Sequence, residues 1–463
     1  MRLLNCICLF CVETCFIQAD AQIVKLQDFY STPFGSTPKG GVVSDGTYYY
    51  GTASAGGDYD HGIIFKGSCN GESFEKVYSF EGGVFGWEPS GAIIYDGTRL
   101  YGMTTYGGSS GYGVVYSLLE DGTDYNVLHD FTGSDGQNPD GFIYNDGLYL
   151  YGTTPVGGAN GKGVLFRIKL NGTAFEILHA FGSDITDGAD PHAQGLASYG
   201  DWLYGQTDSG GIYGNGIVYK IRKDGADYSI LYSFSDGEDA RNPTGTPLFI
   251  DGIIYGTAGG GFYHNGAIYA IDSSGTYYTV LHNFEMIVDG ASPTGLAFAH
   301  DRIYGVTNTG GDNGNGILFF MDVTGLFFLN IEYFNAPYTG AEPNGPLFFD
   351  GNCLYGLTRS GGNHNQGVSF AYCFATEIQI PDQSELINIE PNPAENQLTI
   401  HWTDAEPVTR SMLYDITGKV LIENELNGEQ FLQMDISHLP AGWYLIRLYN
   451  GNKELGHAAW IKK

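Results

Sequence analysis

Residues 101–116 read YGMTTYGGSSGYGVVY, and this arrangement of Tyr-Gly, Gly-Gly, a single Gly and an aromatic residue returns along most of the chain. A Tyr-Gly pair starts each copy, and successive pairs lie 49 to 53 residues apart. A fixed period of about fifty residues indicates stacked supersecondary units. The seven copies begin at Tyr50, Tyr101, Tyr151, Tyr204, Tyr255, Tyr304 and Tyr355.

Each copy contains four short runs of β-branched and aromatic residues separated by Gly, Asp and Pro, a pattern typical of strands joined by hairpins. An Asp-Gly pair such as Asp96-Gly97 precedes several of the Tyr-Gly strands and supplies the positive φ angles of a tight hairpin. Four strands in about fifty residues describe one blade of a β-propeller. We therefore expect an all-β chain with a seven-bladed β-propeller over residues 22–375.

The spacing inside the copies is stricter than the period itself. Six residues separate Gly56 from Gly62, and eighteen separate Gly113 from the strand-ending Phe131, with the same values in other copies. Residues 25–29 match the Phe-ending strand but precede the first copy, whereas the seventh copy lacks that strand. We expect residues 25–29 to complete the seventh blade and close the ring, because closure removes a free sheet edge. The alternative is an open array in which residues 23–29 stay unpaired.

The charge balance argues against a nucleic-acid partner. The 52 acidic residues outnumber the 21 basic ones and give a formal net charge of −31, which repels phosphate backbones. No run of eighteen apolar residues follows the N-terminal segment, so we expect no transmembrane helix. We also expect a monomer without a cofactor.

The N-terminal segment is typical of a secretory signal. Arg2 precedes a mostly apolar stretch, and Ala19-Asp20-Ala21 places small residues where signal peptidase requires them. The segment predicts a signal peptide over residues 1–21, with cleavage between Ala21 and Gln22.

Three cysteines remain after such cleavage. Cys353 and Cys373 flank the seventh Tyr-Gly hairpin and could face each other across adjacent antiparallel strands as a disulfide. Two free buried thiols are the alternative. Cys69 lies in a turn and is expected to be unpaired.

The composition changes after residue 375. Residues 376–385 indicate a linker, and residues 386–463 indicate a small Ig-like antiparallel β-sandwich. The motifs in this tail are Pro391-Asn392-Pro393, Tyr414-Asp415 with Gly418-Lys419, Leu439-Pro440-Ala441-Gly442 with Tyr444, and a basic end.

These motifs resemble the C-terminal sorting domain of type IX (Por) secretion substrates in its type A form. The resemblance implies passage through the inner membrane with a signal peptide, followed by export through the type IX machinery to the outer surface of a Gram-negative bacterium. It also implies that the cargo is secreted or attached to the cell surface. The repeats over residues 22–374 are similar to the Gly-rich GloVer repeats of exported bacterial proteins, a family that implies no activity and no catalytic residues.

The loops that follow the Gly-Gly pairs differ in content although their length is constant. Tyr and His side chains on one rim of a ring could stack on and hydrogen-bond a sugar or a peptide. The alternative is a set of ordinary solvated turns. The candidate ligand-binding residues are Tyr59, His61, Tyr112, Tyr213, Tyr263, His264 and His364.

No arrangement of residues predicts catalysis or metal binding. His129, His179 and His282 share one repeat position, so separate blades hold them apart, and we interpret them as inter-blade packing or edge polar groups. A His-Glu-x-x-His motif is missing from the sequence. We therefore predict a non-enzymatic binding protein whose ligand is a glycan or a protein. The alternative is an extracellular carbohydrate-active hydrolase or lyase built on the propeller.

Overall fold

The computed structural model describes residues 22–374, apart from 193–194, 236 and 238, and most of residues 387–462. The chain folds into two compact units, Met1–Phe374 and Ala375–Lys463. The predicted signal peptide with Ala21, and the predicted linker over residues 376–385, lie outside the described residues, as do Pro391–Pro393, residues 416–419 and Ala441 of the tail motifs.

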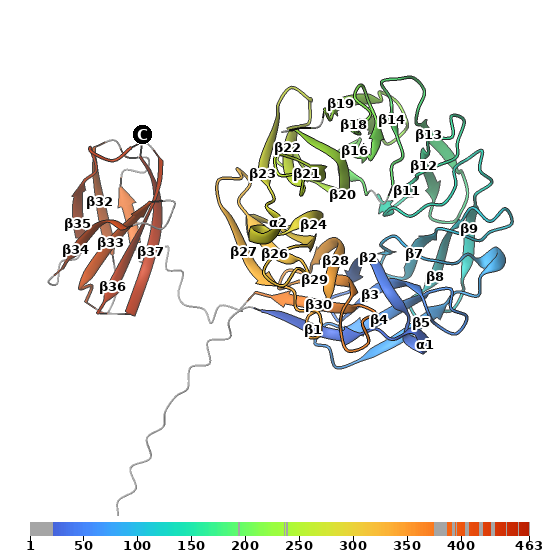
Figure 1. Cartoon of the computed structure of the whole chain (residues 1–463), viewed down its shortest axis with the longest axis horizontal. Coiled ribbons are helices and arrows are strands. Elements are labelled where there is room, and N and C mark those ends of the chain that lie inside the picture. The colour runs from blue at the N-terminus through green and yellow to red at the C-terminus, as the bar shows by residue number, and fades with distance from the viewer. Residues whose placement is uncertain are drawn as a thin grey trace, which may run out of the picture. The chain divides into compact units, whose positions relative to one another are not determined.

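In its described residues the first unit contains seven four-stranded antiparallel sheets arranged around a common centre (Figure 1). In six of these sheets the strands follow chain order from the strand nearest the centre to the outermost one. The first four sheets contain β2 (Ser36–Ser44), β3 (Tyr48–Ala55), β4 (Ile63–Ser68) and β5 (Phe74–Ser79); β6 (Ile94–Tyr95), β7 (Arg99–Thr104), β8 (Val114–Leu119) and β9 (Asn126–Asp130); β10 (Tyr144–Asn145), β11 (Tyr149–Thr154), β12 (Val164–Lys169) and β13 (Glu176–Ala180); and β15 (Ala197–Tyr199), β16 (Trp202–Thr207), β18 (Ile217–Arg222) and β19 (Ser229–Ser233).

The remaining sheets follow the same order, except that the last one takes its outer strand from the start of the chain. They contain β20 (Ala240–Ile250), β21 (Ile253–Gly260), β22 (Ala267–Asp272) and β23 (Tyr278–Asn283); β24 (Ala291–Ala299), β25 (Arg302–Thr309), β26 (Ile317–Met321) and β27 (Phe328–Tyr333); and β28 (Ala341–Phe349), β29 (Cys353–Ser360), β30 (Val368–Cys373) and β1 (Ile23–Asp28). Short α1 (Ser31–Phe34), η1 (Gly83–Phe85) and α2 (Met286–Asp289), and the pair β14 (Gly188–Ala189) and β17 (Ser209–Gly210), lie in connections.

The Tyr-Gly pair packs the interior of each sheet. The seven tyrosines are buried, and several bond the hairpin Asp five residues earlier, as Tyr101 does when it donates to Asp96 over 2.9 Å. Each Gly lies directly opposite a buried aromatic residue on the next strand, as Gly51 lies opposite Phe65. A Cβ at Gly51 would come within 2.5 Å of the Phe65 ring, so only Gly leaves room for it. The repeat therefore belongs to the scaffold, as its regularity indicates.

One junction recurs between all neighbouring sheets. A Pro-x-Gly-like motif, such as Pro89-Ser90-Gly91, begins the inner part of each sheet, and a junction Gly, such as Gly62, lies in the preceding repeat. The residue before the motif donates its N–H to the carbonyl of the residue before the junction Gly, over 2.7 to 3.1 Å, and the Pro ring packs on that Gly. Six junctions join consecutive repeats, and the seventh joins Thr37 and Pro38 to Gln366 and Gly367.

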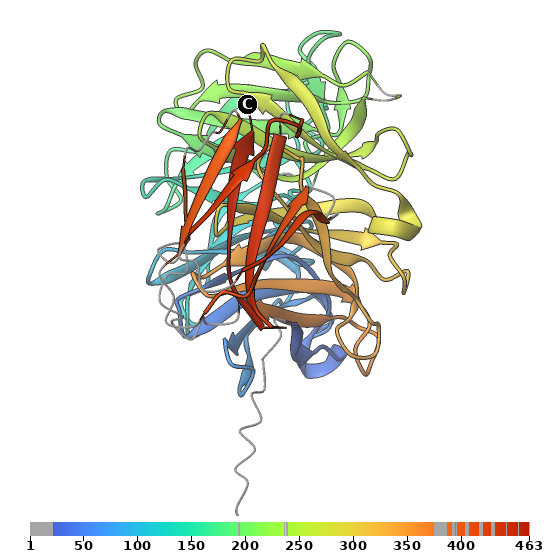
Figure 2. The same cartoon turned by 90° about the vertical axis from the view of Figure 1, so that its left-hand side faces the viewer.

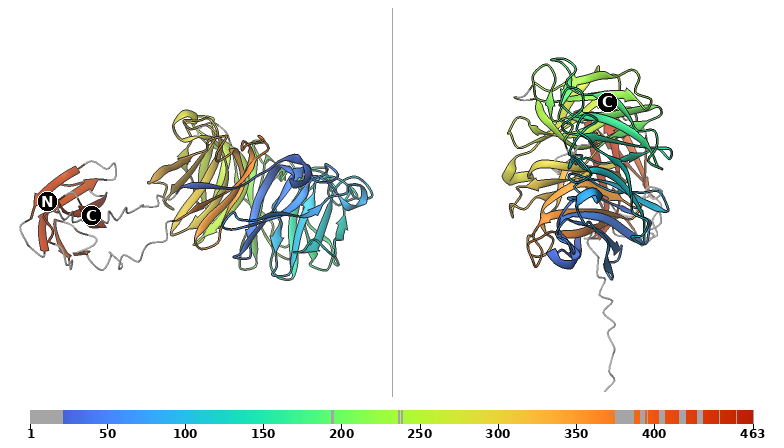
Figure 3. Two further views of the ribbon diagram at one scale, coloured as in Figure 1. Left: turned by 90° about the horizontal axis from the view of Figure 1, so that it is seen from below. Right: turned by 90° about the vertical axis from the view of Figure 1, so that its right-hand side faces the viewer.

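The expected closure by the first strand is confirmed. Strand β1 pairs with β30, and Phe29 donates its N–H to Gly367 over 3.0 Å, as Phe131 does to Gly113 over 3.1 Å. The open array with an unpaired first strand is therefore wrong. Seen from the side, the strands run from one face of the ring to the other (Figure 3).

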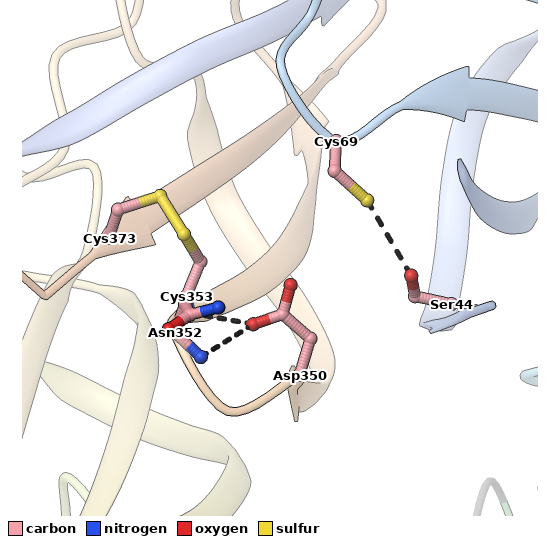
Figure 4. Close-up of a disulfide and its surroundings, with 6 residues drawn as sticks. All are labelled: Ser44, Cys69, Asp350, Asn352, Cys353 and Cys373. Atoms are coloured by element: carbon pink, nitrogen blue, oxygen red, sulfur yellow. Dashed lines mark hydrogen bonds between the residues drawn. A yellow bond between two sulfur atoms is a disulfide. The ribbon is translucent and has the colours of Figure 1, made fainter. Parts of the chain in front are cut away.

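Cys353 and Cys373 are opposite each other on β29 and β30 and form a disulfide (Figure 4). The Cys353 N–H also donates to the hairpin residue Asp350 over 2.8 Å, so the bond lies at the base of a fixed turn. Cys69 is a free thiol that lies 3.5 Å from the Ser44 hydroxyl.

In its described residues the second unit contains two antiparallel sheets. One has the order β31 (Ile387–Glu390), β32 (Gln397–Trp402) and β35 (Phe431–Asp435), and the other β34 (Val420–Glu425), β33 (Arg410–Asp415), β36 (Gly442–Asn450) and β37 (Lys453–Lys462). The long strands of the second sheet run side by side in Figure 2. Leu398 and Ile400 from one sheet and Leu413 and Ile446 from the other share one buried core.

Candidate functional site

Two sets of connections lie on the same face of the ring. Strands alternate in direction, so the loop from the second to the third strand and the connection from the fourth strand to the next sheet leave the same end of the sheets. In six repeats the N–H of the second Gly of the Gly-Gly pair donates to that connection, as Gly108 does to Gly83 over 2.9 Å. We call the surface formed by these two sets of connections the loop face.

The loop face carries most of the exposed large apolar side chains in the described part of the first unit. A buried core explains none of them, because each is at least one-third exposed. Clustered exposure of this kind marks binding surfaces. The side chains are Tyr59, Val84, Phe85, Trp87, Tyr106, Tyr112, Ile185, Ile212, Tyr213, Phe262, Tyr263, Met286, Ile287, Val288 and Tyr338.

The seven residues predicted as ligand contacts all lie on this face but in five different loops: Tyr59 shares a loop with His61, Tyr263 shares one with His264, and the other three lie singly. Tyr59 and Tyr213 are 52% and 60% exposed, so their rings are free to meet a ligand. No ring contact joins two of the seven within the described residues. Their rings instead contact other residues: His61 contacts Trp87 at 5.8 Å between ring centres, His364 contacts Tyr30 at 5.3 Å, and Tyr263 contacts Phe262 at 4.9 Å.

An aromatic pair that the sequence analysis missed lies within the second repeat, at the loop-face end of its sheet. The rings of Trp87 and Tyr106 stack 4.5 Å apart with 24° between their planes, and each side chain is 36% exposed. Their backbones form a two-way bridge, with Trp87 donating to Tyr106 over 2.9 Å and Tyr106 donating back over 3.2 Å. The sequence did mark this pair as an exception, because Trp and Tyr stand in this repeat at positions where several other repeats have small residues.

A cluster of polar residues, separate from the aromatic pair, lies where the inner segments of the third and fourth repeats begin. His192 bonds Asp140 over 2.7 Å through Nδ1, and this hydrogen bond raises the pKa of His192 to about 9. Burial raises the pKa of Asp190, with Asp208 and Asp140 adding to the shift and His192 opposing it. Burial also raises the pKa of Asp208. The missed signal was the spacing of Pro191 and Gly195, which are two residues further apart than in the Pro-x-Gly motifs of other repeats.

The interpretation of the repeated histidines as inter-blade packing is confirmed. The ring of His179 stacks on Tyr228 of the following repeat at 3.7 Å, and His129 and His282 stack in the same way on Phe175 and Phe328. Each His also contacts an Asp of the next connection, as His179 contacts Asp187 at 3.0 Å. These pairs join neighbouring sheets, and each His belongs to a different sheet.

Neither a metal centre nor a membrane-spanning helix occurs in the part of the chain that the structure describes. Within the described residues, no group of three or more His, Cys, Asp or Glu side chains is placed to hold a metal ion. No helix in the described segments has the length and apolar character needed to cross a membrane.

Comparisons with known proteins match both units. Residues 16–213 and 200–380 match the family model described as Gloeobacter/Verrucomicrobia repeat. Residues 388–462 match the model described as secretion system C-terminal sorting domain. The search of curated proteins returned no match.

Solved structures with a similar fold are distant in sequence. The extracellular domain of a hybrid two component system from B. thetaiotaomicron is 12% identical with a TM-score of 0.50, over 96% of this chain and 58% of that one. Oligogalacturonate lyase from Vibrio parahaemolyticus is 9% identical with a TM-score of 0.48, over 77% of this chain and 94% of that one. A chain of the nidogen/laminin complex is 14% identical with a TM-score of 0.40, over 62% and 94%. The first likeness concerns the fold alone.

Proposed function

We infer that this chain, which belongs to the Gloeobacter/Verrucomicrobia repeat family, is an exported, non-enzymatic protein that binds a glycan or protein ligand through its loop face. The sorting domain over residues 388–462 indicates export by type IX secretion. The concentration of exposed aromatic side chains on one face carries the binding proposal. Such residues supply large contact area with little loss of conformational entropy.

The proposed architecture is a closed seven-bladed β-propeller over residues 22–375, followed by a linker over 376–385 and an Ig-like sorting sandwich over 386–463. Seven equivalent junctions, including the one between Pro38 and Gly367, support the blade number. The shared core of the two tail sheets supports the sandwich. A signal peptide over residues 1–21, cleaved between Ala21 and Gln22, and a monomeric state complete the proposal.

Screening the exported protein on a glycan array and against proteins of the cell exterior tests the binding role. We expect binding that falls when loop-face residues such as Tyr59 and Tyr213 are changed to Ala. The matched control is Tyr199→Ala, because Tyr199 is 65% exposed but lies at a hairpin between first and second strands, away from the loop face. Equal loss in the control would show that the loop face is not the binding surface.

Deletion of residues 389–463 tests the export route. We expect the shortened protein to stay in the periplasm, whereas the full chain reaches the medium or the cell surface. A shortened chain that still reaches the outside would refute the sorting assignment.

The carbohydrate-active enzyme is the second candidate, and the carboxylates around His192 favour it. Asp190 and Asp208 both lie near enough to His192 to shift its pKa, and pairs of carboxyl groups perform glycosidic chemistry. Incubation of the protein with neutral and acidic polysaccharides, followed by a reducing-end assay, tests this alternative. Product formation that is abolished by Asp190→Asn would establish the enzymatic activity. Absence of product would exclude that activity on the polysaccharides tested.

A further inference from the structure

We propose that Trp87 and Tyr106 form the binding site for one neutral pyranose residue of an oligosaccharide ligand. This inference rests on the proposed function, because it assigns a ligand class and a position to the loop face. We call these two residues the aromatic platform.

The aromatic platform is an addition to the repeat and does not fill its core. The same pair of positions holds Ala189 and Ser209 in the fourth repeat, and small residues also pair there in the first, sixth and seventh repeats. Those repeats fold with the same junctions, so the two large rings of the second repeat are not required for packing. Their partial exposure of 36% each agrees with a surface that contacts something else.

The platform is already ordered without a ligand. Its two backbone hydrogen bonds and the 4.5 Å ring stacking fix both side chains, and His61 packs against the indole at 5.8 Å. The neighbouring Tyr125 hydroxyl donates to the Phe85 carbonyl over 2.5 Å and fixes the preceding connection. Because the rings lose little freedom on binding, contact with a ligand retains most of its favourable free energy.

The charges beside the platform favour an uncharged ligand. The Lys39 ammonium lies 3.2 Å from the carboxylate of Glu88, the residue after Trp87, and Lys76 forms an ion pair with Asp58 in the loop that carries His61. Both cations are therefore matched by a carboxylate, so neither is left to hold an anionic group, and the exposed Glu81 in the same connection would repel one. An acidic sugar would also meet the field of a chain with a formal charge of −31.

A neutral pyranose fits these conditions. Its apolar C–H face can lie on an aromatic ring, and its hydroxyls can donate to acceptors at the edge of the site. Glu81 is an exposed carboxylate in the same connection and has no ionic partner among the described residues, so it is the acceptor that we expect to receive such hydroxyls. A proline-rich peptide would also stack on the rings but offers few donors to this carboxylate.

Calorimetric titration of the full exported chain tests the proposal, with cellohexaose, maltohexaose and mannohexaose as neutral probes. Hexagalacturonate is the acidic comparison and decaproline the peptide comparison. The test variant is Trp87→Ala/Tyr106→Ser, which installs the pair found in the fourth repeat and should therefore fold. The control is Tyr199→Ala, because Tyr199 is 65% exposed and lies at the hairpin between β15 and β16, away from the loop face.

We expect at least one neutral hexasaccharide to bind, and the double variant to weaken that binding by about tenfold or more. The control should change it by less than about twofold. The melting temperature of the double variant should stay within about 2 °C of the parent, which separates lost binding from lost folding.

Three results would overturn the assignment. The double variant could bind the neutral probe as tightly as the parent, hexagalacturonate or decaproline could bind more tightly than every neutral probe, or no hexasaccharide could bind at all. In each case the proposed function survives if the wider screen finds a ligand lost with other loop-face variants. It falls together with the platform only if that screen also finds none.

Discussion

The ring of Pro38 packs against Gly367, although 329 residues separate them, in the same way that Pro89 packs against Gly62 in the first internal junction. A Cβ added at either Gly would come within 2.6 Å of the proline Cδ. The junction that closes the ring therefore has the same proline–glycine geometry as an internal junction. By this contact, the closing point cannot be told apart from the other junctions.

Substitution of Gly367 by Ala should destabilise the ring by roughly 2–4 kcal/mol, because a left-handed backbone acts together with clashes of the added Cβ against the Thr358 carbonyl and the Pro38 ring. The φ angle of Gly367 is 97°. Gly46→Ala is the matched control, because its φ is 91° and nothing lies within 4 Å of the added Cβ. The control should cost only about 1 kcal/mol in denaturant unfolding. Equal losses would show that the Pro38 contact contributes nothing.

Gly51→Ala should lower the free energy of unfolding by about 1–3 kcal/mol, because its Cβ would overlap the Phe65 ring. The backbone at Gly51 has no positive φ, so packing alone is responsible. The smaller Phe65→Leu side chain should relieve the overlap. A double-mutant cycle between the two changes should therefore give a coupling energy, whereas additive losses would disprove the contact.

Reduction of the Cys353–Cys373 bond should destabilise the ring by about 2–4 kcal/mol, because the bond closes a loop of 20 residues in the unfolded chain. Thermal unfolding with and without a reductant measures the effect. The Cys353→Ser/Cys373→Ser variant should show no response to the reductant. A parent protein with three thiols reactive under denaturing, non-reducing conditions would contradict the bond.

The ion pair between His192 and Asp140 should be present at neutral pH and lost in mild alkali. The folded pKa of His192 is about 9 against an ordinary value of 6.5. Since the folded pKa is the higher one, the pair stabilises the fold fully below pH 6.5 and loses this effect as the pH rises to about 9. Because the His192 side chain is 59% exposed, the change in stability should stay below about 1 kcal/mol.

An NMR titration of the His192 ring measures this pKa directly. Asp140→Asn should bring it back toward 6.5, and a parent value already near 6.5 would refute the pair. The matched control is Asp201→Asn, which removes an exposed carboxylate paired with Arg222 in the fourth repeat and should leave the His192 titration unchanged.

Much of the fold could be predicted because the repeat leaves its packing rules in the sequence. The Tyr-Gly pair, the spacing of Gly113 to Phe131 and the unmatched first strand each correspond to one recurring contact. The contact between the Pro of one repeat and the junction Gly of the preceding repeat was not predicted, because a contact between repeats has no local signature.

The candidate site was harder to predict for the opposite reason. The seven predicted residues were chosen by loop position, and the structure distributes them over five loops without a ring contact between any two of them in the described residues. Trp87 lies outside any Gly-Gly loop, and only the backbone bridge to Tyr106 brings the two rings together. Deviations from the repeat, such as this pair and the wider spacing before Gly195, were more informative than the repeat itself.

The pairing of β1 with β30 sets the order in which this protein can be completed. The ribosome makes β1 before any other strand of the ring, yet its partner is made about 345 residues later. Until then β1 has no neighbour, and the last sheet keeps an open edge that invites pairing with other chains. Ring formation is therefore a late, non-local event, and such long-range contacts form slowly. A chaperone that shields β1 during synthesis or translocation would act on the step at which this architecture is most exposed to misassembly.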